Sequence, residues 1–356
     1  MKYSMLSLPL IRLKKQRNCK VYRLSAMNTL YLTTSDEDLE TAAEIIQKGG
    51  LVAFPTETVY GLGGNALDSE ASKKIYAAKG RPSDNPLIVH VASTEDAAKY
   101  AFVSDDALLL GKALWPAPLT MVLPKKDVPK ETTGGLDTVA IRFPANETAC
   151  RFIEKCGLPI AAPSANTSGR PSPTTWQHVK HDLDGKIDAV ICGDPCEIGI
   201  ESTVVDMTGD APVILRPGFV TPEIIEGVLN KPCTYDPAIM NEAPIGLVPK
   251  APGMKYKHYA PKAEMYLYKG DKSKLEAQIK KDAAKYEAKG KVVKILLYDP
   301  SDLKNAAANL FANLRSLDEE GADIILASAL PEEDSFGFSI MNRMLKAAGH
   351  KLVEVK

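Results

Sequence analysis

Short apolar segments alternate with amphipathic helical segments along residues 36–229, and this alternation constrains the fold most strongly. Residues 36–48 carry apolar side chains at helical spacing and are followed by two glycines, which predicts a helix. Residues 51–54 are all apolar and are followed by Pro55, which is typical of a short buried strand. Further helices are expected at residues 69–79, 107–114, 147–156 and 221–229. Further strands are expected at residues 87–91, 120–123, 139–143, 160–162, 189–192, 203–206 and 213–216. The pattern predicts an α/β domain built on a large, mostly buried sheet.

The pattern changes after residue 229. Residues 230–262 are rich in proline and lack helical or strand periodicity, which predicts a linker. Strands are then expected at residues 263–268, 292–298 and 324–327, alternating with helices at 273–288, 303–320 and 340–348. This βαβαβα order predicts a small, Rossmann-like α/β domain over residues 263–356, after a first domain at residues 28–229.

The first 27 residues differ from the rest, because they contain seven Lys or Arg residues and no Asp or Glu. They resemble an organelle-targeting segment, and the other interpretation is an unstructured leader upstream of Met27. We adopt the leader and exclude these residues from the fold. The formal net charge of −1 excludes a polybasic nucleic-acid binder as a class. Scattered cysteines and apolar stretches well short of a membrane span favour a cytoplasmic location without membrane association.

Four polar loops rich in Gly or Pro follow the predicted strands and helices, at residues 55–64, 79–86, 163–174 and 201–203. Loops at strand ends are where open α/β sheets hold their ligands. These loops and two strand ends carry five cations, namely Lys79, Arg81, Arg142, Arg170 and Arg216. Guanidinium groups bind phosphate and carboxylate oxygens two at a time, so such a cluster suits a polyanion such as ATP. The phosphates of RNA would suit it as well, and that alternative stays open.

Several familiar motifs are absent. The chain contains no phosphate-binding P-loop, no H-E-x-x-H and no nucleophile elbow. Residues 61–66 fit the loose G-x-G-x-x-A form of a dinucleotide fingerprint, but Pro55 and a polar turn separate them from the preceding strand. His178 and His181 are interpreted as a surface helix pair, and Cys192 and Cys196 as ordinary thiols. We therefore expect no bound metal of the protein's own.

His90 lies within an apolar run at residues 87–91, where a structural histidine is the default interpretation. Alternation along the strand puts His90 on one face with Ile88, so its side chain could also emerge near the polar loops.

Seven strings follow one another between residues 36 and 220: PTETVYGLGGNA, KGRPSDNPLIVHV, WPAPLTMVL, VAIRFP, APSANTSGRPSPT, ESTVVD and ILRPG. Together they resemble the YrdC-like threonylcarbamoyl-AMP synthases in order and spacing. The linker string APGMKYKHYAP and the later string FGFSIMNRMLKAA resemble the long form of that family, which has an additional C-terminal domain.

The resemblance implies a large mixed-sheet domain with a basic concave groove, in addition to the small second domain. It implies L-threonylcarbamoyladenylate synthase activity, in which L-threonine, bicarbonate and ATP, accompanied by Mg²⁺, give threonylcarbamoyl-AMP and pyrophosphate. A tRNA threonylcarbamoyl transferase complex would receive the product. The implied ATP contacts are Arg81, Asn85, Thr138, Ser164, Ser172 and Arg216. The implied threonine contacts are Thr58, His90, Arg142, Ala162 through its backbone, and Ser202. Lys79 and Asn166 lie in the same strings, and with Arg81 they are expected to assist the chemistry.

The linker string is dense in aromatic and basic residues, which a passive tether does not need. Tyr256, Lys257 and His258 are therefore expected to close over the site as a lid that excludes water from a labile mixed anhydride. The alternative is that Tyr256 and Tyr259 only dock the linker onto the first domain. Two other functions stay open from the sequence. One is an RNA-binding module without activity, and the other is a transferase that uses carbamoyl phosphate in place of ATP.

Overall fold

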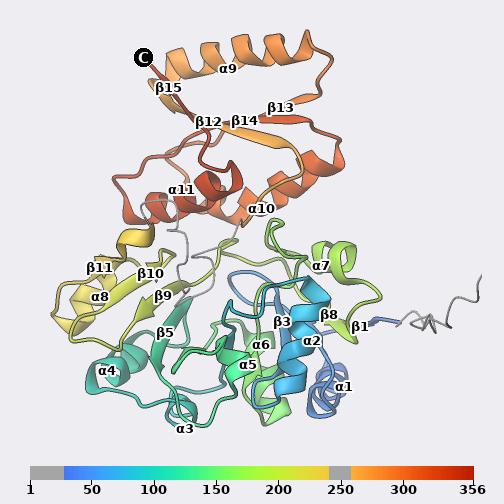
Figure 1. Cartoon of the computed structure of the whole chain (residues 1–356), viewed down its shortest axis with the longest axis vertical. Coiled ribbons are helices and arrows are strands. Elements are labelled where there is room, and N and C mark those ends of the chain that lie inside the picture. Colours follow the sequence, from blue (N-terminus) through green and yellow to red (C-terminus); the bar gives the residue numbers. More distant parts are fainter. Residues whose placement is uncertain (1–27, 240–257) are drawn as a thin grey trace, which may run out of the picture.

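The computed structural model describes residues 28–239 and 258–356. These residues form two α/β units stacked along the long axis of the molecule (Figure 1). The expected leader and most of the lid, including Tyr256 and Lys257, lie outside the described residues. No helix within the described ranges is both long and apolar enough to cross a membrane.

The first domain is built on a mixed sheet, in which eleven described strands run in the order β1-β8-β2-β3-β7-β4-β6-β5-β9-β10-β11. For example, β4 and β6 are parallel whereas β5 and β6 are antiparallel. The strands are β1 Leu30–Leu32, β2 Val52–Phe54, β3 Gly61–Asn65, β4 Ile88–His90, β5 Leu119–Pro124, β6 Thr138–Arg142, β7 Ile160–Ala161, β8 Ala189–Ile191, β9 Thr203–Asp206, β10 Val213–Arg216 and β11 Thr234–Tyr235. The helices are α1 Asp36–Gln47, α2 Ser69–Lys79, α3 Ala97–Tyr100, α4 Asp105–Leu114, α5 Lys130–Thr133, α6 Glu147–Cys156, α7 Trp176–Leu183 and α8 Pro222–Leu229.

Helix α2 shows how local chemistry delivers a loop to the site. The Asp68 side chain accepts a hydrogen bond from the Glu70 amide and caps the first turn. Gly80 ends the helix in the left-handed conformation with φ 62°, which glycine adopts without strain. The chain therefore leaves the helix between Lys79 and Arg81, and the predicted polar loop begins there.

Apolar side chains bury both faces of the sheet. On one face, α1 and α6 pack through Leu39, Ile46 and Phe152 against Phe54 of β2. The opposite face forms a larger cluster that includes Tyr60. Burial of each such side chain stabilises the fold by about 1.5–3 kcal/mol, so the loops at the strand ends stand on a rigid base.

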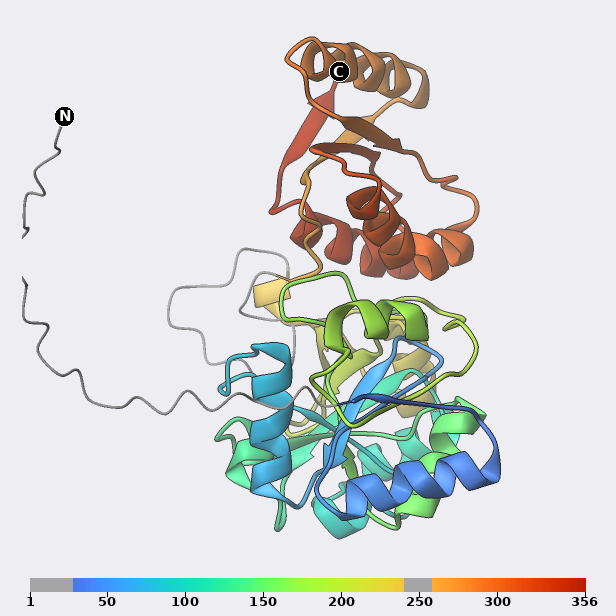
Figure 2. The same cartoon turned by 90° about the vertical axis from the view of Figure 1, so that its right-hand side faces the viewer.

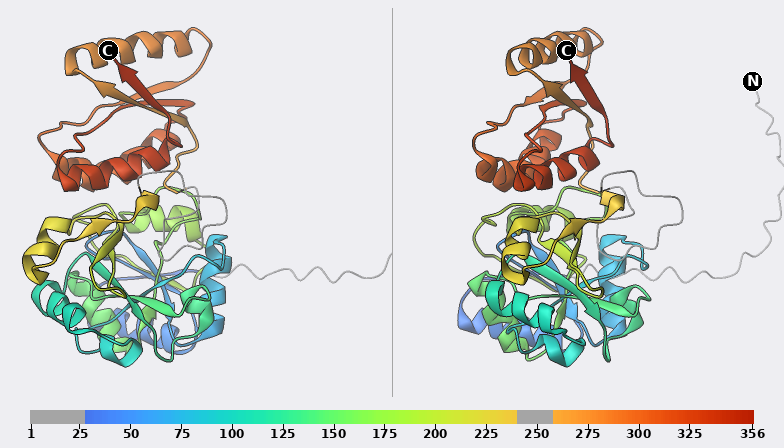
Figure 3. Two further views of the ribbon diagram at one scale, coloured as in Figure 1. Left: turned by 60° about the vertical axis from the view of Figure 1, so that its left-hand side comes forward. Right: turned by 90° about the vertical axis from the view of Figure 1, so that its left-hand side faces the viewer.

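The second domain is a four-stranded parallel sheet in the order β13-β14-β12-β15. Its strands are β12 Glu264–Gly270, β13 Val293–Leu296, β14 Ile324–Ser328 and β15 Leu352–Val355, and its helices are α9 Lys272–Glu287, α10 Leu303–Glu319 and α11 Ser335–Ala347. Helix α9 covers the far face of the sheet, whereas α10 and α11 lie between this sheet and the first domain (Figures 2 and 3). The predicted Rossmann-like unit is thus present, with β15 as an additional strand.

Three further features differ from the expectations. The loop at residues 55–64 contains most of β3, and the range expected as a linker begins with β11 and a 3-10 helix at Pro237–Ile239. Helix α11 begins at Ser335, five residues before the expected start. Glycine explains why β3 and the first turn of α11 were not expected, because glycine weakens the sequence pattern of both strands and helices. Gly63 and Gly337 are needed for close packing, since a Cβ would lie 2.8 Å from the Ile160 side chain and 2.2 Å from the Pro331 carbonyl oxygen, respectively.

Candidate active site

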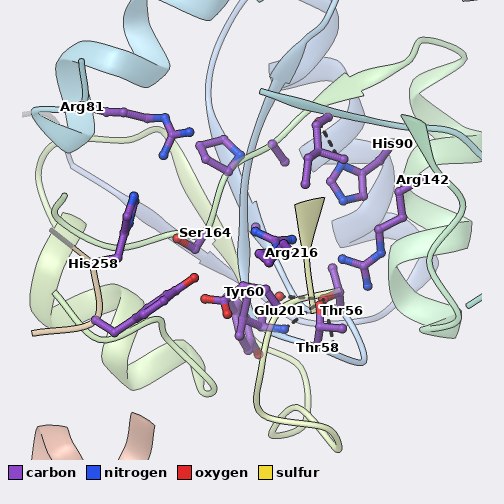
Figure 4. Close-up of a pocket in the computed structure, with 16 residues that line it drawn as sticks. Thr56, Thr58, Tyr60, Arg81, His90, Arg142, Ser164, Glu201, Arg216 and His258 are labelled. Atoms are coloured by element: carbon purple, nitrogen blue, oxygen red, sulfur yellow. Dashed lines mark hydrogen bonds between the residues drawn. The ribbon is translucent and has the colours of Figure 1, made fainter. Parts of the chain in front are cut away.

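A narrow cavity with about 60 Å³ of free space opens at the strand ends of the first domain. The loop after β2, the ends of β4, β6 and β10, and the loop after β7 supply its walls. His258 and Tyr259 line it from the described end of the linker. Figure 4 shows His90 and Arg142 on one side of the cavity, Arg81 and His258 on the opposite side, and Arg216 between them.

Arg81 enters the cavity from the loop after α2. Its Nε donates to the Asn85 carbonyl oxygen at 3.3 Å and its Nη2 to the Pro86 carbonyl oxygen at 3.1 Å. Burial lowers the pKa of this guanidinium to about 10, so it stays cationic at neutral pH. Ser164 lines the cavity nearby. A buried cation that donates to neutral carbonyls, as Arg81 does here, is suited to an anionic ligand.

Arg216 stands at the end of β10. Its Nε donates to the Ser202 carbonyl oxygen and its Nη2 to Ser202 Oγ, both at 3.0 Å. Ser202 Oγ also lies 2.8 Å from Thr120 Oγ1. Ser202 is fully buried behind Arg216 and does not line the cavity, so its expected threonine contact stays a prediction.

Arg142, at the end of β6, points into the opposite side of the cavity. Its Nη2 lies 2.7 Å from Glu57 Oε1, and both side chains are buried. The pair is not aligned as a hydrogen bond, and Arg142 Nε has no hydrogen-bond partner among the described residues. Buried donors without a partner are rare in proteins. A ligand that supplies the missing acceptor would explain the one on Arg142. Thr58 lies close by, with its Oγ1 2.8 Å from Thr56 Oγ1.

His90 does emerge into the cavity together with Ile88, as strand alternation allowed. Its ring packs edge-on against Phe54, and Nδ1 lies 3.2 Å from the Ile88 carbonyl oxygen. Burial, assisted by the charge of Arg142, lowers the pKa of His90 to about 3. The imidazole is therefore neutral at physiological pH.

Lys79 and Asn166 shape a neighbouring loop and do not line the cavity. Lys79 Nζ donates to the carbonyl oxygens of Ser164 and Asn166 at 2.5 Å each, and burial lowers its pKa well below the usual value. Asn166 Oδ1 accepts from Ser164 Oγ at 2.6 Å. Both side chains fix the conformation of the loop that presents Ser164, and their catalytic roles stay predictions.

Three of the expected ATP contacts do not line the cavity. Asn85 is buried with Oδ1 unpartnered among the described residues, and Thr138 is half-buried at the start of β6. Ser172 Oγ donates to Glu201 Oε1 at 2.5 Å. Ala162 lines the cavity as expected.

Arg170 lies outside the cavity, unlike Arg81, Arg142 and Arg216. Its Nη2 pairs with Asp318 of α10 at 3.1 Å, so it links the two domains and is not a cavity residue. The thiols of Cys192 and Cys196 are free, and the described residues contain no group of three His, Cys, Asp or Glu that could hold a metal ion.

Sequence reasoning missed two buried acids and one aromatic residue. Glu57 pairs with Arg142, and Glu201 and Tyr259 line the cavity. Burial opposes ionisation of Glu201, but the nearby Arg343 and Arg216 outweigh it and lower the pKa of this carboxyl. Both acids stand beside predicted site residues, in the strings PTETVYGLGGNA and ESTVVD, and an acid within cation-rich loops was the available signal.

A mixed sheet with a buried, arginine-rich cavity at its strand ends and a second parallel domain defines the two-domain YrdC-like class. Residues 44–218 match the Sua5/YciO/YrdC family model, described as "Telomere recombination", and residues 220–349 match the C-terminal domain of threonylcarbamoyl-AMP synthase. The chain belongs to the threonylcarbamoyl-AMP synthase family, in its long form.

Individual relatives agree over most of their length. The Pyrococcus abyssi threonylcarbamoyl-AMP synthase is 47% identical over 333 residues, covering 89% of this chain and 96% of that protein. The Bacillus subtilis threonylcarbamoyl-AMP synthase is 44% identical over 345 residues, covering 90% and 96%. The crystal structure of P. abyssi Sua5 complexed with L-threonine superposes with a TM-score of 0.87 at 45% identity, covering 92% of this chain and 99% of that one.

Proposed function

We propose that this site joins L-threonine, bicarbonate and ATP into threonylcarbamoyl-AMP and releases pyrophosphate. The observation that carries the proposal is that one cavity has two sides with different polar residues. Arg142, Thr58 and the neutral His90 stand at one side, and Arg81 stands at the other with Arg216 between them. The names of the relatives and the L-threonine complex of the P. abyssi protein support the same activity.

The side with Arg142 suits an amino acid. The unpartnered Nε of Arg142 can donate to the carboxylate of threonine, and Thr58 and His90 can meet its hydroxyl and amine. The His90 imidazole is neutral, so it adds no positive charge beside the amine of threonine. That amine must lose a proton before it can react. Bicarbonate supplies CO₂ by losing hydroxide, which takes up the proton of the ammonium group to give water. The neutral amine then attacks CO₂ and forms the N–C bond, while one C–O π bond breaks and its electron pair moves to oxygen. One N–H proton passes to solvent and leaves a carbamate.

The side with Arg81 suits the phosphates of ATP. A carbamate oxygen attacks the α-phosphorus, the bond to the bridging oxygen breaks, and pyrophosphate departs with its electron pair. Arg81 and Arg216 would neutralise the charge that develops on the phosphate oxygens. The step needs alignment and fixed charge more than a protein nucleophile.

Mg²⁺ would arrive as part of the nucleotide substrate. Glu201 lines the cavity and Glu57 lies beside Arg142, and each acid is paired with an arginine, so they are poor ligands for a resident ion. Mg²⁺ commonly binds phosphate oxygens and retains several waters, which fits a site without a carboxylate cluster of its own.

Closure of the site would protect the mixed anhydride until a tRNA threonylcarbamoyl transferase complex receives it. His258 and Tyr259 support this role, because both line the cavity, Tyr259 as a buried residue and His258 as a half-buried one. Of the three residues expected in the lid, only His258 lies within the described ranges.

The test is pyrophosphate release by the purified full-length chain with Mg²⁺-ATP. We expect release that requires both L-threonine and bicarbonate, and a product with the mass of threonylcarbamoyl-AMP. Release without threonine would make the chain an ATPase, and product formed from carbamoyl phosphate without ATP would make it a different transferase. RNA binding without any turnover would leave only the binding-module function.

A further inference from the structure

We propose that the second domain is part of the nucleotide site, with Arg343 of α11 as a positioning residue for ATP. In this view Arg343 sets the affinity for ATP and leaves the affinity for L-threonine nearly unchanged. The inference rests on the proposed function, because it takes the Ser172 and Arg216 loops as the nucleotide side.

Arg343 is fully buried where α11 meets the first domain. Its Nε donates to Glu201 Oε2 and its Nη2 to the Glu201 carbonyl oxygen, both at 3.2 Å. Its Nη1 donates to the Pro217 carbonyl oxygen and, at 3.0 Å, to that of Ser339. A planar fork that meets several acceptors at once fixes their relative positions, which a flexible ammonium does not do.

The acceptors of Arg343 belong to the loops that carry nucleotide-side residues. Glu201 lines the cavity, and its other oxygen accepts from Ser172 Oγ. Pro217 directly follows Arg216, and Ser339 of α11 adds a hydrogen bond to the Gly218 carbonyl oxygen at 3.0 Å. Arg343 is thus a junction between the loop of Ser172 and the loop of Arg216.

Helix α10 holds the same side with a second buried arginine. Arg315 donates through Nε and Nη2 to the Pro171 carbonyl oxygen at 3.1 and 2.6 Å. It also pairs with Asp182 at 2.9 Å. Pro171 precedes Ser172, so α10 and α11 both fix this loop, α11 through Glu201.

The threonine side is held differently. Three polar threonine-side residues line the cavity, namely Thr58, His90 and Arg142. In the described part of the chain their side chains meet Thr56, Ile88 and Glu57, which all belong to the first domain. Ser202 follows Glu201 in the chain but does not line the cavity. Loosening the contacts of α11 should therefore act on ATP first. This asymmetry separates a positioning role from general packing.

The experiment is Arg343→Lys in the full-length chain, with Mg²⁺-ATP and L-threonine affinities measured separately by calorimetry. Lysine keeps a cation beside Glu201 but cannot serve Glu201 and Pro217 together. We expect the ATP affinity to fall about tenfold and the threonine affinity to stay within about twofold. Ser335→Ala is the matched control, because Ser335 lies on the same helix and bonds exposed Glu223 at 2.8 Å across the same interface. It should change neither affinity.

An equal loss of both affinities, or no loss of either, would overturn the proposal. Thermal unfolding identifies a variant that fails to fold. If Arg343→Lys does not fold, Arg315→Lys replaces it, and the same comparison of ATP affinity with L-threonine affinity is made. Failure of the proposed function is distinguishable, because the unaltered chain would then bind no ATP or release no threonine-dependent pyrophosphate.

Discussion

Buried arginines determine the chemistry of this protein at the scale of single residues. Arg81, Arg142, Arg216, Arg315 and Arg343 are all at most 9% exposed. A buried cation is costly unless hydrogen bonds or an acid compensate it. Arg315 and Arg343 are satisfied by protein groups, whereas Arg142 has an Nε without a hydrogen-bond partner among the described residues. The first pair therefore supports the architecture, whereas Arg81 and Arg142 line the cavity.

Arg81→Ala and Arg216→Ala should each lower turnover by ~30- to 1000-fold, which corresponds to roughly 2–4 kcal/mol of lost transition-state stabilisation. The reason is the loss of a desolvated cation beside the place proposed for the phosphates. Pyrophosphate release at saturating substrates measures it. The control is Arg151→Ala, which removes a surface ion pair with Asp36 outside the cavity lining and should leave turnover unchanged. Near-normal turnover of either folded variant would contradict the assignment of that arginine.

His90 should make the fold sensitive to mild acid. Its pKa is about 3 in the folded chain and about 6.5 when unfolded, so only the unfolded state gains this proton at pH 5.5. A lowered folded-state pKa means that its contribution to stability is complete above about pH 6.5 and declines as the pH falls toward 3. Between pH 7.5 and 5.5 the unaltered chain should lose about 1.4 kcal/mol more than His90→Gln, measured by urea unfolding. The exposed His350→Asn is the control, and equal losses in chain and variant would show that His90 is not buried as a neutral group.

At the scale of elements, periodic segments were predictable and glycine-rich or partner-dependent ones were not. Helix α2 matches its expected bounds because its pattern, its Asp68 cap and Gly80 all agree. Strand β3 carries almost no side-chain pattern, so only pairing with β2 and β7 reveals it. Glu201 could not be paired with Arg343 in advance, because 142 positions separate them and no local rule joins two domains.

Gly199 permits the close approach of α10 to the first domain. It has φ +76°, and a Cβ there would lie 2.4 Å from Ala308 Cα and 2.5 Å from the Ala307 carbonyl oxygen. Gly199→Ala should therefore destabilise the fold by about 1–3 kcal/mol beyond the backbone strain. Gly290→Ala is the matched control, since Gly290 has φ +75° but open space around its Cα. Equal unfolding midpoints for the two variants would show that this approach is not tight.

At the scale of the whole molecule, the two domains share one interface of apolar and polar contacts. Val59 and Ile200 of the first domain belong to the same buried cluster as Phe311 of α10. Tyr259 stacks on Phe311 with ring centroids 5.2 Å apart, so the described end of the linker is fixed to the second domain while it lines the cavity. A movement of α10 would therefore change the cavity in two ways, through the contact of Arg315 with Pro171 and through Tyr259.

Thermodynamic linkage requires that such coupling act in both directions. If α11 favours the arrangement that binds ATP, ATP must in turn favour the docking of α11. We expect Mg²⁺-ATP to slow amide hydrogen exchange in residues 335–347, and L-threonine alone to leave it unchanged, because the threonine side is held within the first domain. Strand β13 provides the internal control, since it lies at the edge of the second sheet away from the interface and should not respond to either ligand. In Arg343→Lys the ATP effect on α11 should shrink together with the affinity. Slowing by threonine alone, or an ATP effect that persists undiminished in Arg343→Lys, would mean that the two domains communicate by another route.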